Sequence, residues 1–413
     1  MNTITARTLS ERISRAQPPC SRRMKVLLYS TDFLPGIGGA QQAVAHLAQG
    51  LLDTGNQPTV VTKTPSGTFN DRDLTYRVVR RPGLRDLWRL LGEAEVVHLA
   101  GPAFIALMLG LLRRKAIVIE HHGYQAICPN GLLLYAPRQT ACPGHFLAGE
   151  YRECLRCVAK ASGWLSSLWQ LLIMFPRRWM CRRVSANAAI SQHVERRLQL
   201  PHSHTVYYGV PDLCGEAVSL GVSSPAPVCF GFVGRLVEEK GLTVLLEAAC
   251  QIRKRGYDFR VKFIGDGPQR ARLEEFVLQR GLRSQVIFMG SIKGEALRAA
   301  TADIAAVIVP SIMEETAGLA AIEQMMRGRL VIASDIGGLG EVVGETGLKF
   351  PAGNAEQLAS CMQRVLDEPG IVNELGARAR ERSLRLFSEP RMIEEHLDLY
   401  RDVLSELELN NGN

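Results

Sequence analysis

Short apolar runs of strand length alternate with longer amphipathic stretches along almost the whole sequence. A strand, a helix and a second strand in this order form the repeating unit of a parallel sheet covered by helices. The alternation therefore predicts an α/β protein. In the first half of the chain the predicted strands are Lys25–Ser30, Thr59–Thr62, Val96–Leu99, Ala116–Glu120 and Ala186–Ile190, and the clearest helices are Gln41–Leu52 and Pro102–Leu112.

The alternation stops once, at a polar and proline-rich stretch over residues 211–227, and then resumes. We interpret this stretch as a linker between two domains, because 413 residues exceed what one hydrophobic core usually serves. The predicted domains cover residues 24–215 and 228–387, and each is a doubly wound, Rossmann-like fold. In the second domain the predicted strands are Val228–Val233, Arg260–Ile264, Val286–Met289, Ala305–Val309 and Leu330–Ala333.

The two ends of the chain differ from these domains. Residues 1–23 are polar and arginine-rich, and we expect a loose tail. Residues 388–413 contain a helix with one apolar face over Glu389–Glu408, which we expect to pack back toward the N-terminal domain. Two doubly wound domains face each other across a cleft, and ligands bind where the carboxyl ends of the strands meet. Candidate site residues therefore belong at strand ends.

Charge and cysteine content limit the compartment and the partners. The net charge of +8 suits anionic partners such as nucleotides or phospholipid head groups, but nothing else in the sequence favours nucleic acid. Ten cysteines are too few for a disulfide scaffold at this length. No apolar stretch reaches the roughly 20 residues that a spanning helix needs, and the start lacks the apolar core of a secretion signal. We expect a cytoplasmic protein.

Two cations follow the first predicted strand of the C-terminal domain. That strand ends at Gly234, Arg235 comes next, and Lys240 stands five residues later at the start of a helix. Charge-assisted hydrogen bonds from two such cations suit a diphosphate, at about 1.5–3 kcal/mol each. A solvated basic loop is the alternative.

Two carboxylates eight residues apart follow the strand Ala305–Val309. Glu315 lies in the loop after this strand, and Glu323 lies two turns into the following helix, which we expect to begin near Gly318 and Leu319. A loop carboxylate can hold sugar hydroxyls, and the later one can reach a ribose diol. The free N–H groups and the dipole at the helix start favour a phosphate. An ordinary surface helix is the alternative.

These two motifs, in this order and separation, closely resemble those of the retaining glycosyltransferases of family 4, the group 1 transferases, which have the GT-B fold. The resemblance extends from Met24 to about Phe387. It implies that Arg235 and Lys240 neutralise the leaving diphosphate of a nucleotide-sugar donor, so that catalysis needs no metal or other cofactor. It further implies that Glu315 touches the donor sugar and that Glu323 binds the ribose.

The N-terminal domain agrees with this resemblance. Gly38 and Gly39 follow the first strand and precede a helix, like the family's Gly-Gly loop beside the donor phosphate and the acceptor. His122 follows the strand Ala116–Glu120 and is similar to the family's active-site histidine, with His121 as an alternative. Tyr208 stands where the family usually has Asn. The acceptor implied is a sugar or a lipid-linked hydroxyl, in the synthesis of a cell-surface polysaccharide or glycolipid.

A cysteine-rich loop is predicted over residues 122–157. It contains Cys128, Cys142, Cys154 and Cys157, the last two as Cys-x-x-Cys, and His145 is a substitute ligand. Four thiols within about thirty residues can form a tetrahedral zinc site, which here would be structural. Free or partly buried thiols are the alternative.

Residues 163–183 combine apolar and basic side chains. Three of the four tryptophans of the chain lie between positions 164 and 179, beside four arginines. This combination suits insertion into the surface of an anionic membrane, at the inner face if the protein is cytoplasmic. A buried helix with a solvated basic end is the alternative.

Other functions fit the sequence less well. A GT-B nucleotide-sugar epimerase or phosphorylase is one alternative, although such epimerases lack the arrangement of Glu315 and Glu323. A non-catalytic nucleotide-sugar-binding protein stays open as another alternative, although the set of charged residues is intact. A dehydrogenase would need a Gly-x-Gly-x-x-Gly turn after the first strand. A metal-dependent GT-A transferase has only Asp71-Arg72-Asp73 in its favour, and no apolar strand precedes that tripeptide.

Overall fold

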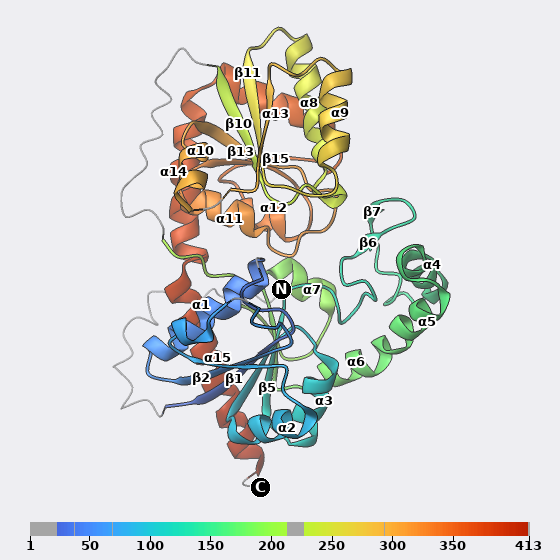
Figure 1. Ribbon diagram of the computed structural model, residues 1–413, viewed down its shortest axis with the longest axis vertical. Helices are drawn as coiled ribbons and strands as arrows, with labels where there is room; N and C mark the ends of the chain where they lie inside the picture. The colour runs from blue at the N-terminus through green and yellow to red at the C-terminus, as the bar shows by residue number, and fades with distance from the viewer. Residues whose placement is uncertain (1–22, 37, 68, 213–226, 293, 412–413) are drawn as a thin grey trace, which may run out of the picture.

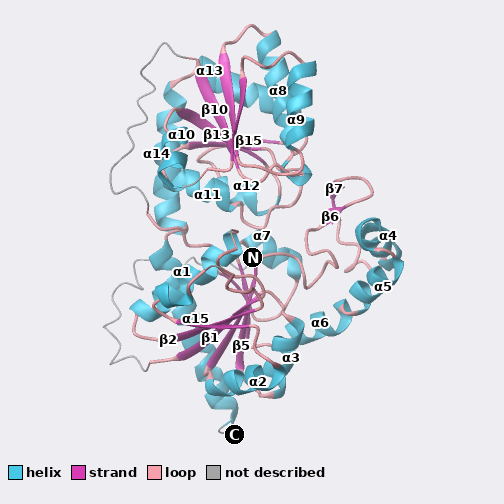
Figure 2. Cartoon of the chain, viewed as in Figure 1, coloured by secondary structure: helices cyan, strands magenta, loops and turns pink. Residues whose placement is uncertain are grey.

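The computed structural model describes residues 23–36, 38–67, 69–212, 227–292 and 294–411. It confirms the predicted α/β class, with one parallel sheet in each of two domains and helices packed on the sheet faces (Figures 1 and 2). The predicted tail before Arg23 and residues 213–226 of the predicted linker lie outside the described residues.

The N-terminal domain is built on a seven-stranded parallel sheet in the order β3-β2-β1-β4-β5-β8-β9. The order reverses beside β1, which pairs with β2 on one side and β4 on the other, as in doubly wound folds. The strands are β1 Lys25–Ser30, β2 Gln57–Thr62, β3 Arg77–Arg80, β4 Val96–Ala100, β5 Ala116–His121, β8 Ala186–Ala189 and β9 Ser203–Thr205, and the helices between them include α1 Gly39–Asp53, α2 Leu84–Glu93, α3 Phe104–Leu112 and α7 Gln192–Leu198.

The C-terminal domain repeats this plan with six parallel strands in the order β12-β11-β10-β13-β14-β15. The strands β13 and β14 are buried along their whole length and are apolar except for Ser334, as expected for a sheet covered on both faces. The strands are β10 Val228–Val233, β11 Phe259–Ile264, β12 Val286–Gly290, β13 Ile304–Val309, β14 Leu330–Ser334 and β15 Leu348–Phe350; the helices are α8 Leu242–Lys254, α9 Arg270–Gln279, α10 Gly294–Thr301, α11 Leu319–Met326, α12 Gly337–Val343, α13 Ala355–Asp367 and α14 Gly370–Leu386.

The helix α15, Glu389–Asn411, leaves the C-terminal domain and runs along the N-terminal one (Figure 1). It contacts α1 and β5. Its buried side chains Met392, Leu397, Tyr400 and Val403 belong to the same apolar cluster as Val26 of β1. The core of the N-terminal domain is therefore completed by residues that follow the C-terminal domain in the sequence.

A separate segment between β5 and β8 extends to the side of the N-terminal domain (Figure 1). It contains the hairpin β6–β7, Leu134–Tyr135 and Thr140–Ala141, and the helices α4 Tyr151–Ser162, α5 Trp164–Leu172 and α6 Met174–Cys181. The prediction of a cysteine-rich loop through residue 157 was wrong at its end, because Cys154 and Cys157 lie in α4.

Candidate functional site

The carboxyl ends of both sheets meet around α7, which contacts α12 of the opposite domain. The Glu341 carboxylate on α12 accepts hydrogen bonds from the backbone N–H groups of Gln192 (2.9 Å) and His193 (2.8 Å) in the first turn of α7. A carboxylate at a helix N-terminus satisfies free N–H groups and complements the helix dipole. One domain therefore caps a helix of the other.

Glu314, the neighbour of the predicted Glu315, makes a second link between the domains. Its carboxylate lies 3.0 Å from His193 Nε2 and 3.0 Å from Arg197 Nε, both on α7. Next to it, Ser191 Oγ donates to the Thr316 carbonyl over 2.5 Å. Nothing in its motif distinguishes Glu314 from the neighbouring acidic residues, since its partners lie more than a hundred residues away in the sequence.

Lys240 and Glu315 lie together, as the resemblance implied. The Lys240 ammonium forms a hydrogen-bonded ion pair with Glu315 Oε1, and Ser311 Oγ donates to the same oxygen over 2.5 Å. Glu315 is only 9% exposed, so this carboxylate is held in place. Gly241 makes the approach possible, because a Cβ there would lie 2.0 Å from the Pro310 carbonyl oxygen.

The start of α11 lies against the glycine loop of the N-terminal domain. Gly318 adopts a left-handed conformation (φ 68°) as the N-cap of α11. A Cβ on Gly39 would lie 2.6 Å from Leu319 Cδ2, so the two domains are in close contact here. Gly38 precedes it in extended backbone. Gly38, Gly39, Gly318 and Leu319 therefore meet at one place in the cleft.

Arg235 and Glu323 stand apart from the Lys240–Glu315 pair. Arg235 follows Gly234 at the end of β10, and its side chain is 76% exposed, 4.0 Å from Glu239. Glu323 faces a cavity of about 460 Å³ that is also lined by Gln42 and His46 of α1. Burial raises the pKa of Glu323. The structure thus leaves Arg235 free to reach a ligand and places Glu323 between α11 and α1.

His122 lies at the end of β5, where its ring is held on both sides. Nδ1 is 2.6 Å from Tyr208 Oη, and Nε2 is 3.1 Å from Glu120 Oε2. The ring also stacks on Tyr208 with centroids 5.5 Å apart. The residue that replaces the family's usual Asn therefore fixes the histidine. His122 nevertheless lines a cavity of about 680 Å³.

Glu120 is the centre of a buried network behind His122, which the sequence did not predict. Its side chain is 2% exposed, and His98 Nε2 of β4 lies 3.3 Å from Oε2. His396 Nε2 of α15 lies 3.6 Å from Oε1. Burial alone would raise the pKa of Glu120, but the three surrounding imidazoles more than offset this and hold the pKa well below its usual value. Glu120 is therefore an ionised carboxylate in the core.

His121, the alternative to His122, is a structural residue in this arrangement. It is completely buried, and its Nε2 lies 2.9 Å from Asn187 Oδ1. Desolvation lowers its pKa from 6.5 to about 4 and lowers the pKa of His396 to about 4 as well. Both histidines are therefore neutral in the folded protein near neutral pH.

These two histidines predict a pH dependence of stability. Between pH 6.5 and about 4 the unfolded chain binds protons that the folded chain does not, so the free energy of unfolding falls as the pH falls through this window. The urea midpoint is expected to be lower at pH 5 than at pH 7.5. The difference should shrink in His121→Gln and persist in the control His204→Gln, which changes an exposed histidine. Equal midpoints at both pH values would contradict this prediction.

The four cysteines of the predicted zinc site are all buried and all free. Desolvation and the neighbouring thiols Cys128, Cys142 and Cys157 raise the pKa of Cys154 to about 12. Within the described residues, the one group of three metal-binding side chains with ligand atoms within 4.8 Å of one another is His98, Glu120 and His396, not the cysteines. His145 bonds instead to Glu150. Zinc binding by the cysteines stays a prediction.

The helices α5 and α6 expose apolar side chains, which we call the apolar face. The degree of exposure reaches 63% at Trp164 and 81% at Leu165. Of the four arginines nearby, Arg178 donates to the carbonyls of Leu198 and Gln199, and Arg183 stacks on Trp179 at 3.6 Å. The apolar face consists of Trp164, Leu165, Leu168, Trp169, Leu172, Phe175 and Trp179, with Ile105, Met108 and Leu112 of the adjoining α3.

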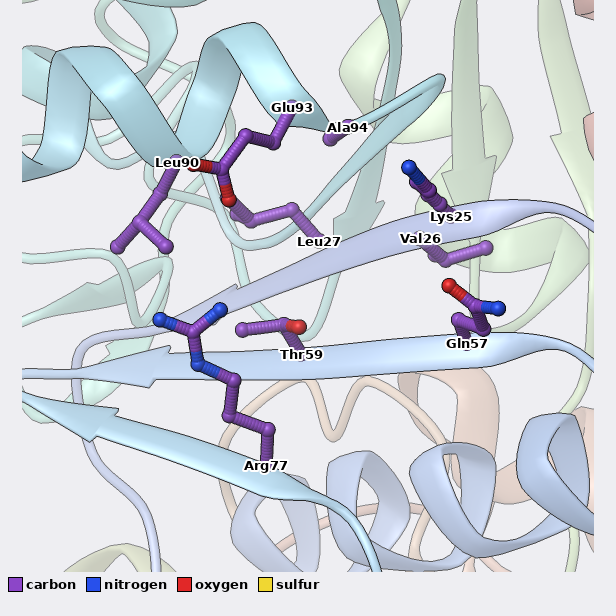
Figure 3. A pocket seen from close by; sticks show the side chains of 9 residues that line it. All are labelled: Lys25, Val26, Leu27, Gln57, Thr59, Arg77, Leu90, Glu93 and Ala94. Carbon is purple, nitrogen blue, oxygen red and sulfur yellow. The ribbon is translucent and has the colours of Figure 1, made fainter.

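Another cavity, of about 260 Å³, lies at the opposite edge of the N-terminal sheet (Figure 3). Lys25, Gln57 and Arg77, which line it, are the first residues of β1, β2 and β3. Ligands of open α/β sheets bind at the carboxyl ends of the strands. We therefore assign the candidate site to the cleft between the domains and not to this cavity.

None of the helices described in the structure is both long and apolar enough to cross a membrane.

Comparisons with solved structures agree with the observed fold. A sucrose-phosphate synthase from Thermosynechococcus elongatus superposes with a TM-score of 0.70 at 22% identity, covering 93% of this chain and 100% of that chain. HepE from Anabaena, in complex with UDP-glucose, superposes with a TM-score of 0.67 at 16% identity, covering 93% of this chain and 100% of that chain. The chain therefore has the GT-B fold.

Comparisons of sequence identify the family. A 2-deoxystreptamine glucosyltransferase from Streptomyces kanamyceticus is 30% identical over 49% of this chain and 56% of that protein, and the chain spans about half the length of the first curated relatives it matches. A 2-deoxystreptamine N-acetyl-D-glucosaminyltransferase from Streptomyces fradiae is 27% identical over 84% of this chain and 90% of that protein. Residues 37–211 match the model described as Glycosyltransferase Family 4, and residues 227–368 match Glycosyl transferases group 1. With one model matching each domain, the chain belongs to glycosyltransferase family 4, the group 1 glycosyltransferases.

Proposed function

We propose that this protein transfers a hexosyl group from a nucleotide-sugar donor to an acceptor hydroxyl with retention of anomeric configuration. The observation that carries the proposal is the Lys240–Glu315 pair, which lies beside the start of α11 in the cleft. A cation, a fixed carboxylate and free helix N–H groups match a diphosphate joined to a sugar. The UDP-glucose complex of HepE is consistent with such a donor.

In the proposed mechanism Arg235 and Lys240 neutralise the charge that develops on the diphosphate. The bond between the anomeric carbon and the diphosphate oxygen breaks, which leaves an oxocarbenium-like sugar. The acceptor oxygen forms its bond to the same face of that carbon, and the hydroxyl proton passes to the departing diphosphate. His122, fixed by Tyr208, borders the reacting sugar from the N-terminal domain.

A screen of nucleotide sugars tests this proposal. Purified protein is incubated with each donor and with mixed acceptors, release of the nucleotide diphosphate is measured, and the anomeric configuration of the product is read by NMR. We expect one donor to be preferred and the product to keep the donor's configuration. An inverted product would contradict the mechanism. Interconversion or phosphorolysis of the donor would identify an epimerase or a phosphorylase, and binding without turnover a non-catalytic protein.

We further propose that the protein acts in cell-surface polysaccharide or glycolipid synthesis, at the inner face of an anionic membrane that binds the apolar face. Exposed tryptophans beside Arg182 and Arg183 support this placement, since each basic residue near such a surface contributes about 1 kcal/mol. The protein is expected to float with phosphatidylglycerol vesicles. The double change Trp164→Ser, Leu165→Ser should abolish flotation, and Leu384→Ser, an exposed leucine on α14, should not. Equal flotation of both variants would contradict the prediction.

The cysteines are proposed to hold a structural zinc ion, separate from catalysis. The thiols are buried, and zinc prefers such ligands as thiolates, so a bound ion would offset the burial and the neighbouring thiols that raise the pKa of Cys154. Protein purified without added metal is expected to contain about one zinc per chain. Cys154→Ser with Cys157→Ser should lose the zinc, and Cys250→Ser, outside this segment, should keep it. Metal-free wild-type protein would refute the proposal.

A further inference from the structure

The cavity beside His122 extends from the ends of the strands to the helices α5 and α6. Its lining includes His122 and Gln41 of α1, and also Trp169, Ile173 and Arg177 from the segment of α5 and α6. Its volume of about 680 Å³ is the largest of the cavities described above. A pocket of this size accommodates a ligand of several hundred daltons.

This cavity opens on the apolar face. Trp169 and Ile105 belong to both, and their exposed fractions are 65% and 40%. Phe104 and Ala103, at the start of α3, continue the apolar lining inward. An apolar chain could therefore run from the apolar face onto this part of the lining, in a cavity that His122 also lines.

Two cationic side chains, Arg177 and Lys63, line the cavity. Arg177 of α6 is half-buried, its Nε has no hydrogen-bond partner, and its guanidinium reaches only the Gln125 carbonyl (3.4 Å) and Met174 Sδ (3.8 Å). Lys63 lines the same cavity. Within the described residues neither cation forms an ion pair, and the cavity contains one carboxylate, Asp32. A half-buried cation without a counterion costs free energy that an anionic ligand would offset.

We propose that this cavity binds the acceptor, and that the acceptor is a phosphorylated lipid carrying the hydroxyl that is glycosylated. Its apolar tail lies against Trp169 and Ile173 and continues into the membrane, its phosphate contacts Arg177 and Lys63, and its hydroxyl end lies near His122. This assignment rests on the transferase function proposed above, because it names the second substrate of that site.

Binding of farnesyl diphosphate tests the assignment by isothermal titration calorimetry below the micelle concentration. We expect it to bind at least about tenfold more tightly than inorganic diphosphate or farnesol, because the cavity offers partners to both tail and head. Trp169→Ser and Arg177→Gln should each weaken binding about tenfold or more. Trp164→Ser is the matched control, since this tryptophan lies on the same helix with 63% exposure but outside the cavity.

The outcomes separate this proposal from the transferase function. Hydrolysis of the preferred nucleotide sugar without acceptor reports on the donor site. Trp169→Ser should lose binding of the probe and still hydrolyse the donor, whereas no hydrolysis by the wild type would count against the transferase function. Farnesyl diphosphate that binds no more tightly than diphosphate overturns the acceptor assignment. So does equal loss in Trp169→Ser and Trp164→Ser. Binding that is lost in Lys240→Ala but kept in Trp169→Ser would place the probe in the donor site and also overturn it.

Discussion

Replacing Lys240 by alanine is expected to lower kcat/KM for the nucleotide-sugar donor by about two to three orders of magnitude. The lysine pairs with Glu315 in the loop before α11, where we propose that the leaving diphosphate gains charge as its bond to the sugar breaks. Each charge-assisted hydrogen bond lost is worth about 1.5–3 kcal/mol. Initial rates over a range of donor concentrations measure the effect, and kcat should fall more than KM rises.

Lys262→Ala is the matched control for this substitution. Lys262 lies in the same domain, on β11, and pairs at 2.6 Å with Asp303, which precedes β13 and is 58% exposed. Both variants lose a lysine and its ion pair, but only Lys240→Ala removes a cation from the proposed donor site. Turnover by Lys262→Ala is expected to match that of the wild type. If Lys240→Ala also turned over at a near-normal rate, the assigned role of this lysine would be wrong.

Glu120→Ala is expected to lower the free energy of unfolding by about 3–5 kcal/mol, which corresponds to a fall in Tm on the order of 10 °C. The substitution removes the carboxylate on which His98, His122 and His396 converge, and it leaves His98 Nε2 buried without its hydrogen-bond partner. Glu120→Gln keeps an oxygen that can accept from His98, so its loss should be smaller. Differential scanning calorimetry at pH 7.5 measures both.

An exposed ion pair provides the comparison for Glu120. Glu274 pairs with Arg270 at 2.8 Å on the surface of α9, and such pairs are usually worth less than about 1 kcal/mol. Glu274→Ala should therefore melt within about 2 °C of the wild type. A Tm for Glu120→Ala as high as that of Glu274→Ala would show that the buried network contributes no net stability.

The sequence was sufficient to locate the strands whose side chains are apolar throughout. β1 and β10 have the predicted boundaries, because each contains a continuous apolar run, over residues 26–29 of β1 and over Val228–Val233 of β10. β3, Arg77–Arg80, was missed, since an edge strand needs apolar contact along only part of its length. Likewise, residues 163–183 are predicted as one stretch, whereas Ile173 divides them into α5 and α6. Gly163, with φ +74°, separates α5 from α4.

The site was predictable where the chemistry lies in short motifs. Lys240 and Glu315 were identified because each follows a strand end and matches a family motif. Glu120, His98 and His396 were not, since they come together only when α15 packs against β5. The one signal in the sequence was a carboxylate at the end of the apolar run Ala116–Ile119, where an unpaired charge would be costly. Such a charge indicates a buried partner but does not say which residue supplies it.

The position of α15 has a consequence for synthesis on the ribosome. Its buried side chains complete the apolar core beside α1 and β5, yet the whole C-terminal domain is translated before them. Domains generally fold in the order in which they emerge, but here the N-terminal sheet emerges first with part of its core missing. Until Tyr400 is added, the sites of Glu120 and His98 remain open to water. The C-terminal domain, although synthesised second, is therefore the first that can complete its core. The core of the N-terminal domain is completed only when α15 packs on it.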